Sequence, residues 1–228
     1  MSRRMNEGIA KQLYEKGYAF IPSLTPSIGT KSVANRIGLI LEISKLKGHE
    51  LIPNIQTLKP REINCQIKNQ YSGNYGFGIF PLHTDLAHWS LPPRYLLLRC
   101  IKGTKSVSTY IMSSKSLDKN LLKKAIVKPR RNTGHFNNCM LPVSFNIGTV
   151  QGVRWDSLFL EPLNSAAERL FEILRPSNMS NLACEIVLTN PGDTIIIDNW
   201  KMIHGRGVVN KNESSRVIER VYLTDIKG

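Results

Sequence analysis

A histidine and an aspartate stand two residues apart in the segment Phe80-Pro81-Leu82-His83-Thr84-Asp85. If this segment is an extended strand, His83 and Asp85 emerge side by side on one face and Thr84 points away. With a second imidazole they would form a facial triad of two histidines and one carboxylate, which leaves three coordination positions of an iron ion open. A His-x-Asp tripeptide also arises by chance on solvated strands, so the pair needs a third ligand.

The candidate for the third ligand is His204, in Asp198-Asn199-Trp200-Lys201-Met202-Ile203-His204-Gly205-Arg206. Before it come a predicted tight turn, Asn190-Pro191-Gly192-Asp193, and an apolar run, Thr194-Ile195-Ile196-Ile197, that predicts a buried strand. A lone histidine in such a place is more often a core residue with satisfied hydrogen bonds than a ligand. His204 is interesting because a His-x-Asp pair exists elsewhere in the chain.

The last predicted strand, 215–224, carries two arginines. By the period of two, Arg216, Ile218, Arg220 and Tyr222 share one face. Two arginines facing a barrel interior are costly unless an anion binds them, and guanidinium forms bidentate hydrogen bonds with carboxylates. A dicarboxylate fits this pattern; the alternative is an outward strand face with solvated arginines.

In this order, His83-Thr84-Asp85, the Pro-Gly-Asp turn with its apolar strand, His204-Gly-Arg, and then Arg216 and Arg220 resemble the taurine dioxygenase and clavaminate synthase-like branch of the Fe(II)/2-oxoglutarate-dependent oxygenases. The resemblance spans roughly residues 75 to 225, and the ordered combination carries it. It implies one domain over residues 1–228 with a double-stranded β-helix, a jelly-roll sandwich flanked by helices from the N-terminus and from residues 164 to 175.

The resemblance also implies roles for individual residues. His83, Asp85 and His204 would be the catalytic Fe(II) ligands, and 2-oxoglutarate and O2 would be co-substrates. Arg216 would clamp the distal carboxylate of 2-oxoglutarate, with Arg220 helping around its other end. Thr109, on a strand predicted at 106–111, would hydrogen-bond the same distal carboxylate; its alternative role is that of a β-branched strand residue. The expected reaction is hydroxylation with release of succinate and CO2, with desaturation or cyclisation also open.

Composition bounds the alternatives. The chain has 228 residues, 41% of them hydrophobic, and 31 Lys and Arg against 17 Asp and Glu give a net charge of +14. This charge favours an anionic substrate or partner, small or carrier-bound, and would also suit nucleic acid. The densest basic segment runs from Lys123 to Arg131, where relatives place a mobile lid; it could equally be a partner site or a solvated surface.

Two readings from other classes stay open on these residues. One is a non-catalytic jelly-roll protein that uses the triad for a structural metal such as zinc, which would not need Arg216 and Arg220. The other is a basic nucleic-acid-binding module, against which stands the lack of a helix-turn-helix or RNP-type pattern. No segment of the sequence approaches the ~18 consecutive apolar residues of a membrane span, and no signal-peptide core follows Met1, so we expect a cytoplasmic protein without membrane contact.

Periodicity predicts the scaffold. Helices are expected at 5–16, 31–44, 116–127 and 165–175, the last opened by a capping box at Ser165-Ala166-Ala167-Glu168. Strands are expected at 18–22, 80–85, 95–98, 106–111, 184–189 and 194–197, and a strand pair turned at Gly148 spans 142–147 and 149–155.

Overall fold

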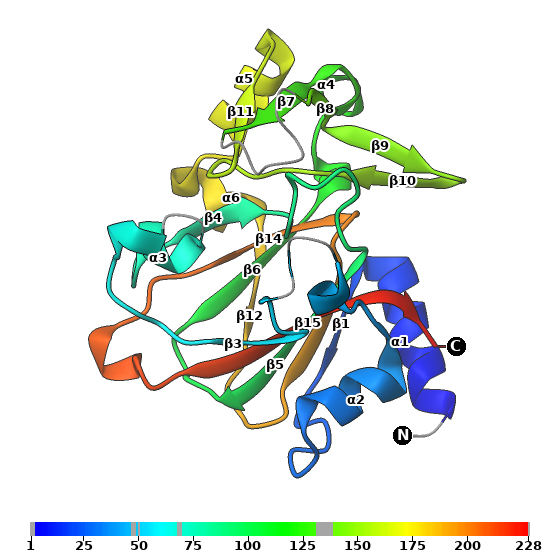
Figure 1. Cartoon of the computed structure of the whole chain (residues 1–228), viewed down its shortest axis with the longest axis vertical. Helices are drawn as coiled ribbons and strands as arrows, with labels where there is room; N and C mark the ends of the chain where they lie inside the picture. The colour runs from blue at the N-terminus through cyan, green and yellow to red at the C-terminus, as the bar shows by residue number, and fades with distance from the viewer. Residues whose placement is uncertain (1–2, 47–48, 50, 68–69, 131–138, 228) are drawn as a thin grey trace.

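The computed structural model describes residues 3–46, 49, 51–67, 70–130 and 139–227. Arg131, the last residue of the predicted basic segment, lies outside the described residues. The described chain is built on two antiparallel sheets, with two smaller sheets and a group of helices above them (Figure 1). None of the described helices combines the length and apolar character needed to cross a membrane.

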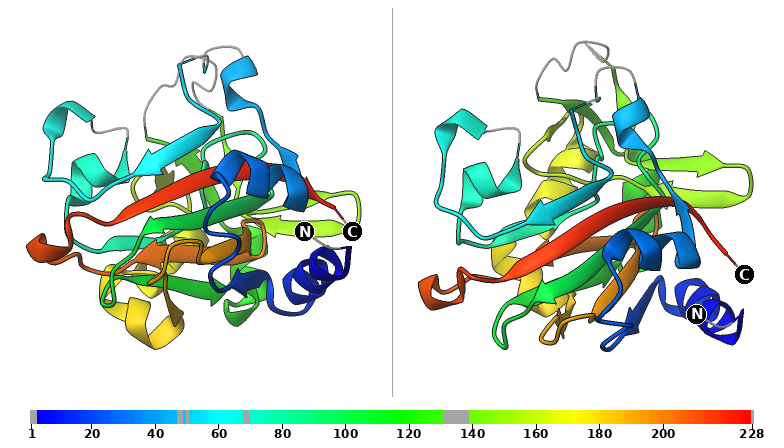
Figure 2. Two further views of the ribbon diagram at one scale, coloured as in Figure 1. Left: turned by 90° about the horizontal axis from the view of Figure 1, so that it is seen from below. Right: turned by 60° about the horizontal axis from the view of Figure 1, so that its bottom comes forward.

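The larger sheet has its apolar runs at the centre. Its strand order is β1 (Tyr18–Ile21), β13 (Thr194–Asp198), β5 (Tyr95–Lys102), β15 (Val217–Ile226) and β2 (Gly38–Ile40), with β3 (Ile55–Leu58) also paired to β15. Figure 2 shows β15 running between β3 and β5. β13 is buried along its whole length, as expected of a central strand with both faces covered.

The smaller sheet carries the predicted metal ligands. Its strand order is β12 (Cys184–Val187), β6 (Ser108–Ser113), β14 (Met202–Arg206) and β4 (Phe80–His83). Ile111 and Met202 of this sheet pack against Leu96, Leu98 and Ile218 of the larger one, so these two sheets form the sandwich.

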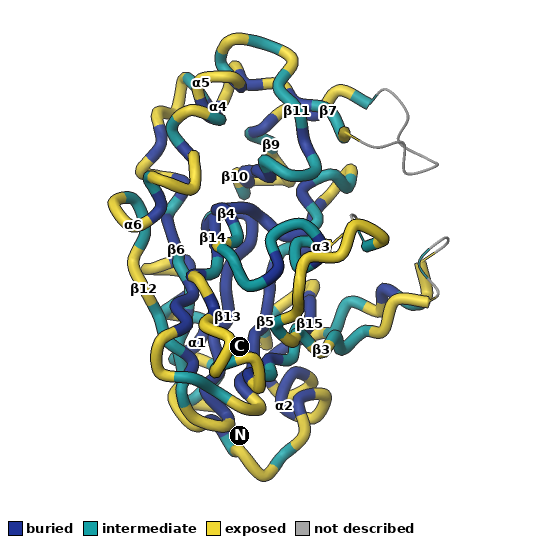
Figure 3. Tube along the Cα trace, turned by 90° about the vertical axis from the view of Figure 1, so that its left-hand side faces the viewer, coloured by how far each residue is buried: buried dark blue, intermediate teal, exposed yellow. Residues whose placement is uncertain are grey.

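Alternation along each strand fills three cores. In β5, Leu96 and Leu98 point between the sheets, whereas Leu97 joins the helices α1 (Arg3–Lys16) and α2 (Thr30–Ile37) on the outer face. The third core lies on the outer face of the smaller sheet, where Leu82 and Ile203 meet the upper elements. Figure 3 shows the buried segments running through the centre of both sheets and the exposed ones around them.

The upper elements connect β6 to β12. They comprise α4 (Lys119–Lys124), β7 (Ile126–Pro129), β8 (Leu141–Pro142), β9 (Ser144–Ile147), β10 (Val150–Val153), β11 (Leu160–Pro162), α5 (Ser165–Ile173) and α6 (Met179–Leu182). β11, β7 and β8 form one small sheet and β9 and β10 form a hairpin, while α3 (Tyr71–Tyr75) lies beside β4 (Figure 1).

The jelly-roll sandwich with flanking helices is confirmed, and the predicted hairpin turns at Gly148, which has a φ of 57°. Three local predictions are wrong. The helix expected at 31–44 ends at Ile37, because Gly38 is extended and the next residues pair with β15. The helix expected at 116–127 is confined to Lys119–Lys124, and α5 is capped by Asn164, whose side chain accepts the N–H of Ala167, in place of Ser165.

Candidate functional site

The two histidines form a cross-strand pair at the edge of the smaller sheet. His83 ends β4 and lies directly opposite His204 of β14, and their ring centroids are 4.5 Å apart. Their neighbours Leu82 and Ile203 point into the outer core, so by the period of two both imidazoles face the inside of the sandwich. The strand pairing thus brings together two candidate ligands that are 121 positions apart in the sequence, from 83 to 204.

Asp85 reaches the same place from beyond the end of the strand. β4 stops at His83, and the chain turns at Leu86, which has a positive φ of 55°. Asn199 fixes this turn: its Oδ1 accepts the backbone N–H of Asp85 at 2.8 Å and its Nδ2 donates to the carbonyl of Asp85 at 3.0 Å. The predicted juxtaposition of His83 and Asp85 is therefore present, but a clamped turn produces it, where the sequence predicted a continuing strand.

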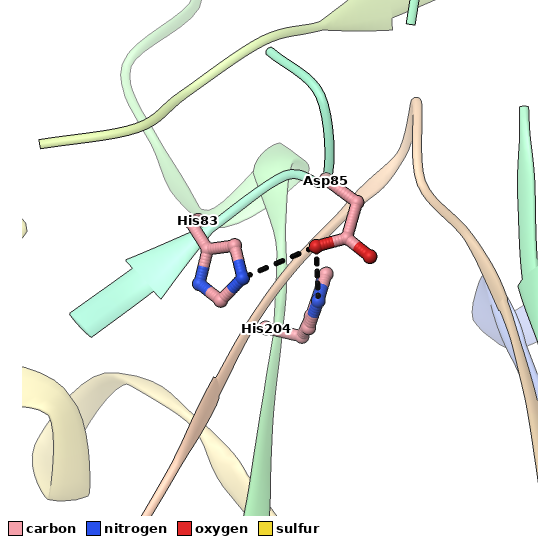
Figure 4. Close-up of side chains that lie close together, drawn as sticks. All are labelled: His83, Asp85 and His204. Carbon is pink, nitrogen blue, oxygen red and sulfur yellow. Dashed lines mark ion pairs between the residues drawn. The ribbon is translucent and has the colours of Figure 1, made fainter. Parts of the chain in front are cut away.

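The three side chains converge on one point (Figure 4). Oδ1 of Asp85 lies 3.3 Å from Nε2 of His83 and 3.6 Å from Nε2 of His204, and one ligand atom from each residue falls within 4.8 Å of the others. Octahedral ligands at about 2.1 Å from a metal lie about 3 Å from one another, so this donor set fits a metal bound on one face.

The tautomer of His83 is fixed for ligation. Its Nδ1 lies 2.8 Å from the carbonyl oxygen of Pro81, which can only accept, so Nδ1 carries the proton. In the neutral ring Nε2 is then the nitrogen available to a metal, and it is directed at Asp85. Burial opposes the charged ring, but the contact with Asp85 raises the pKa of His83, so a metal bound here would displace a proton that this contact favours. All three triad side chains are buried.

The second oxygen of Asp85 is occupied by protein groups. Arg220 Nη1 donates to Oδ2 at 3.0 Å and the Tyr222 hydroxyl donates to it at 2.9 Å. Burial opposes the charge on Asp85, but Arg220 first, and then the two histidines, hold the pKa of this carboxyl well below its ordinary value. Burial and the neighbouring His83 lower the pKa of His204, which favours the neutral imidazole that a metal needs.

The triad opens into a cavity of about 560 Å³ between the sheets. Arg216, Ile218, Arg220 and Tyr222 all line it, so the predicted face of the last strand does point inward, although Arg216 immediately precedes β15. Thr109 of β6 lines the cavity as well. The structure therefore gathers the predicted residues around one space.

Arg216 and Arg220 differ in their surroundings. Arg220 is held by Asp85 and by Gln56 of β3, whose Oε1 accepts from Nε at 3.2 Å. Arg216 is only 7% exposed, yet its Nε has no hydrogen-bond partner among the described residues, and burial lowers its pKa to about 10. The charge of Glu213 acts on Arg216 without forming an ion pair with it among the described residues. A buried guanidinium in this state is a position where an anion would be stabilised.

Arg206, which the sequence places in the His204-Gly-Arg motif without indicating a role, adds a third guanidinium. It is the cross-strand partner of Thr109, and its guanidinium carbon lies 3.5 Å from the ring centroid of Phe80. Nη2 donates to the carbonyls of Gly76 and Gly78, both at 2.7 Å. Burial and the nearby Arg216 lower the pKa of Arg206 to about 9, so the two arginines form a desolvated like-charge pair.

Thr84 has a structural partner that its outward direction did not reveal. Its hydroxyl accepts the N–H of Trp155 at 3.0 Å and donates to the Trp155 carbonyl at 3.3 Å, and the side chain is buried. His88 lies on the cavity wall, where burial and then His49 lower its pKa to about 4. The roles of Asn199, Tyr222 and Thr84 depend on contacts across more than 70 residues, for which the sequence carries no local signal.

No protein-family model and no curated protein matches the chain. Among solved structures, an asparagine oxygenase in complex with Fe(II), 2S,3S-3-hydroxyasparagine and succinate superimposes with a TM-score of 0.68, at 14% identity, over 97% of this chain and 79% of that one. The non-heme iron oxygenase OrfP in complex with Fe and alpha-ketoglutaric acid superimposes with a TM-score of 0.64 at 17% identity, over 98% of this chain and 81% of that one. The PvcB protein from Pseudomonas aeruginosa superimposes with a TM-score of 0.66 at 13% identity, over 97% of this chain and 82% of that one. The chain thus shares the fold of solved Fe(II)/2-oxoglutarate oxygenases.

Proposed function

We propose that the protein is an Fe(II)- and 2-oxoglutarate-dependent dioxygenase that hydroxylates a C–H bond of a small or carrier-bound substrate. The observation that carries this proposal is the combination, in one cavity, of a buried two-histidine, one-carboxylate set with a buried arginine, Arg216, whose Nε has no hydrogen-bond partner among the described residues. A metal site with open positions beside a site for an anion is what a chelating, anionic co-substrate requires.

The metal ligands in this proposal are Nε2 of His83, Nε2 of His204 and Oδ1 of Asp85. Bound Fe(II), together with 2-oxoglutarate and O2, supplies the oxidising power, and succinate and CO2 are the coproducts. The protein contributes ligation, orientation and exclusion of water. Arg220 and Tyr222 direct the carboxylate by holding its Oδ2, so that Oδ1 faces the metal position.

The distal carboxylate of 2-oxoglutarate is assigned to Arg216, with Thr109 as a hydrogen-bond donor. Both residues line the cavity and both side chains are buried, so the contact would form away from bulk water, where charged hydrogen bonds are strong. The structural neighbour solved with Fe and alpha-ketoglutaric acid supports this choice of co-substrate. The like-charge neighbour Arg206 adds to the positive potential at this end of the cavity.

The substrate is proposed to be a small molecule, since the structural neighbours were solved with hydroxylated asparagine or arginine. Five Lys and Arg residues and two Asp residues line the cavity. Bound 2-oxoglutarate would neutralise two of the five positive charges, and the remaining excess supports an anionic group on the substrate as well. A structural-metal role is disfavoured because it gives no reason for a buried Arg216 that forms no ion pair with a described residue and whose Nε has no described hydrogen-bond partner.

The test is anaerobic titration of the purified protein with Fe(II) and then with 2-oxoglutarate, following the metal-to-ligand charge-transfer band and, after O2 is admitted, succinate formation. We expect one Fe(II) per chain and a band that saturates with 2-oxoglutarate. Asp85→Ala and His204→Ala should lose iron and succinate formation, whereas His49→Ala, which removes a histidine outside the triad, should retain both. Equal iron content and turnover in all variants would refute the triad.

A further inference from the structure

A second carboxylate, that of Asp156, lies on the cavity wall and is not used by the proposed metal site. Asp156 follows β10, its side chain is only 1% exposed, and its Oδ1 accepts the N–H groups of Leu158 at 2.8 Å and Phe159 at 2.9 Å. No lysine or arginine in the described part of the chain forms an ion pair with it. Burial raises the pKa of this carboxyl, because removing the ionised group from water costs free energy.

The turn formed by residues 156 to 159 does not by itself require a charge. An asparagine side chain would accept the same two N–H groups without the cost of burying an ionised group. The positive groups near the carboxylate do not offset that cost either. Among the described residues, His83 is the one ionisable group whose positive charge would lower the pKa of Asp156, and this histidine must be neutral to bind a metal.

The walls beside Asp156 are aromatic. The rings of Tyr71 and Phe159 meet edge to face with centroids 5.6 Å apart, and His88 packs on Phe159 at 5.8 Å; all three residues line the cavity. His88 is neutral at physiological pH, because burial and His49 lower its pKa to about 4. Aromatic faces around a carboxylate, with no cation of their own, favour a positively charged ligand group.

This acidic, aromatic region adjoins the metal site on the side of His83. The Tyr71 ring stacks on His83 with centroids 4.1 Å apart, and Asp156 acts electrostatically on both residues. The charges that act on Arg216 are those of Cys100 and Glu213, and Arg206 is affected by Arg216, so Asp156 neutralises neither arginine. The cavity therefore offers a basic region for 2-oxoglutarate and a separate acidic one beside the metal ligands.

We propose that Asp156 binds a positively charged side-chain nitrogen of the primary substrate, a protonated amine or a guanidinium, against the rings of Tyr71 and Phe159. This inference rests on the proposed function, since it takes the basic region to be filled by 2-oxoglutarate. The substrate would then be amino-acid-like, with its cationic nitrogen at Asp156 and a C–H bond held near the metal.

The experiment uses the anaerobic Fe(II)–2-oxoglutarate protein and pairs of compounds that keep the same α-amine and differ in the side-chain charge: L-arginine with L-citrulline, and L-lysine with L-2-aminoheptanoate as its isostere of uncharged side chain. Agmatine and cadaverine test cations without a carboxylate. Binding is read from the change in the charge-transfer band. We expect at least one cationic member to bind at least tenfold more tightly than its isostere. Asp156→Asn should remove that preference while the band without ligand stays the same. Asp118→Asn, the same charge change at the exposed cap of α4, should keep the preference.

The outcomes separate the two proposals. If the band fails to form in the unmodified protein, the proposed dioxygenase function is wrong. If the band forms but no cationic compound binds at millimolar concentration, or neutral isosteres bind equally well, the assignment of Asp156 is wrong. An unchanged affinity in Asp156→Asn, with a thermal melting profile like that of the unmodified protein, would overturn it too.

Discussion

The hydroxyl of Tyr222 donates a 2.9 Å hydrogen bond to Oδ2 of Asp85 across 137 positions of the sequence. Arg220, two residues earlier on the same face of β15, donates to the same oxygen at 3.0 Å. The larger sheet therefore orients a candidate metal ligand that lies just beyond the edge strand of the smaller sheet. With Oδ2 occupied, Oδ1 is the oxygen left for a metal, which favours ligation through a single oxygen atom.

Tyr222→Phe should weaken Fe(II) binding by about tenfold, because it removes one hydrogen bond to a charged group, worth roughly 1.5–3 kcal/mol, part of which water or Arg220 can replace. The measurement is competition for Fe(II) with a chelator under anaerobic conditions. Tyr95→Phe is the matched control, since Tyr95 is a buried tyrosine outside the cavity. Equal iron affinity in Tyr222→Phe and the control would show that Tyr222 does not orient the ligand.

Arg216→Ala should raise the 2-oxoglutarate requirement by about ten- to a hundred-fold, the equivalent of losing one charged hydrogen bond of roughly 1.5–3 kcal/mol. The 2-oxoglutarate requirement of Arg216→Lys should lie between those of the unmodified protein and Arg216→Ala, because lysine keeps the charge but loses the bidentate contact. Iron affinity should be unchanged in both variants, since the triad is untouched. The midpoint of the charge-transfer titration decides this, and the same midpoint in Arg216→Ala and the unmodified protein would refute the assignment.

How far the sequence can predict this molecule depends on the range of the interaction. The period of two predicts that Arg216, Ile218, Arg220 and Tyr222 share one face, because strand geometry alone fixes it, and this face lines the cavity. The inward direction of His83 and His204 comes from the pairing of β4 with β14, which the sequence did not predict. The helical spacing of apolar residues, another local pattern, predicted a helix that continued past Ile37. In the structure residues Gly38 to Ile40 pair with β15 instead, and this tertiary contact overrides the amphipathic pattern. The positions of Asp85, Asn199 and Asp156 depend on turns and on contacts between distant segments, which no local pattern encodes.

Thr84 provides a direct test of such a contact. From its outward direction alone Thr84→Val would be harmless, but the structure gives its hydroxyl two hydrogen bonds to the backbone of Trp155. Valine would leave a buried N–H unsatisfied, at a cost of about 1–3 kcal/mol in the free energy of unfolding. Thr84→Ser keeps the hydroxyl, so its free energy of unfolding should fall by less than that of Thr84→Val. Denaturant unfolding of both variants measures the difference. A Thr84→Val protein as stable as the unmodified one would show that the hydrogen bonds of the Thr84 hydroxyl to Trp155 do not stabilise the fold.

The net charge of +14 should assist the entry of anions through basic residues at the cavity rather than through the densest basic segment. Lys59 and Arg61 are exposed residues that line the cavity. Lys123 and Lys124 do not line it, and Lys128 forms a 2.7 Å ion pair with Glu161. Since charges more than about 8 Å apart are largely screened at physiological ionic strength, the nearer pair should dominate.

We therefore expect a Lys59→Gln, Arg61→Gln double variant to bind 2-oxoglutarate severalfold more slowly at low salt and to show a weaker dependence of the association rate on ionic strength. Stopped-flow recording of the charge-transfer band over a series of salt concentrations measures both. The Lys123→Gln, Lys124→Gln double variant removes the same charge and should retain the rate and its salt dependence, because these lysines lie on α4, away from the cavity. If this control variant instead lost the salt dependence, the segment from Lys123 onward would be the surface that attracts the co-substrate.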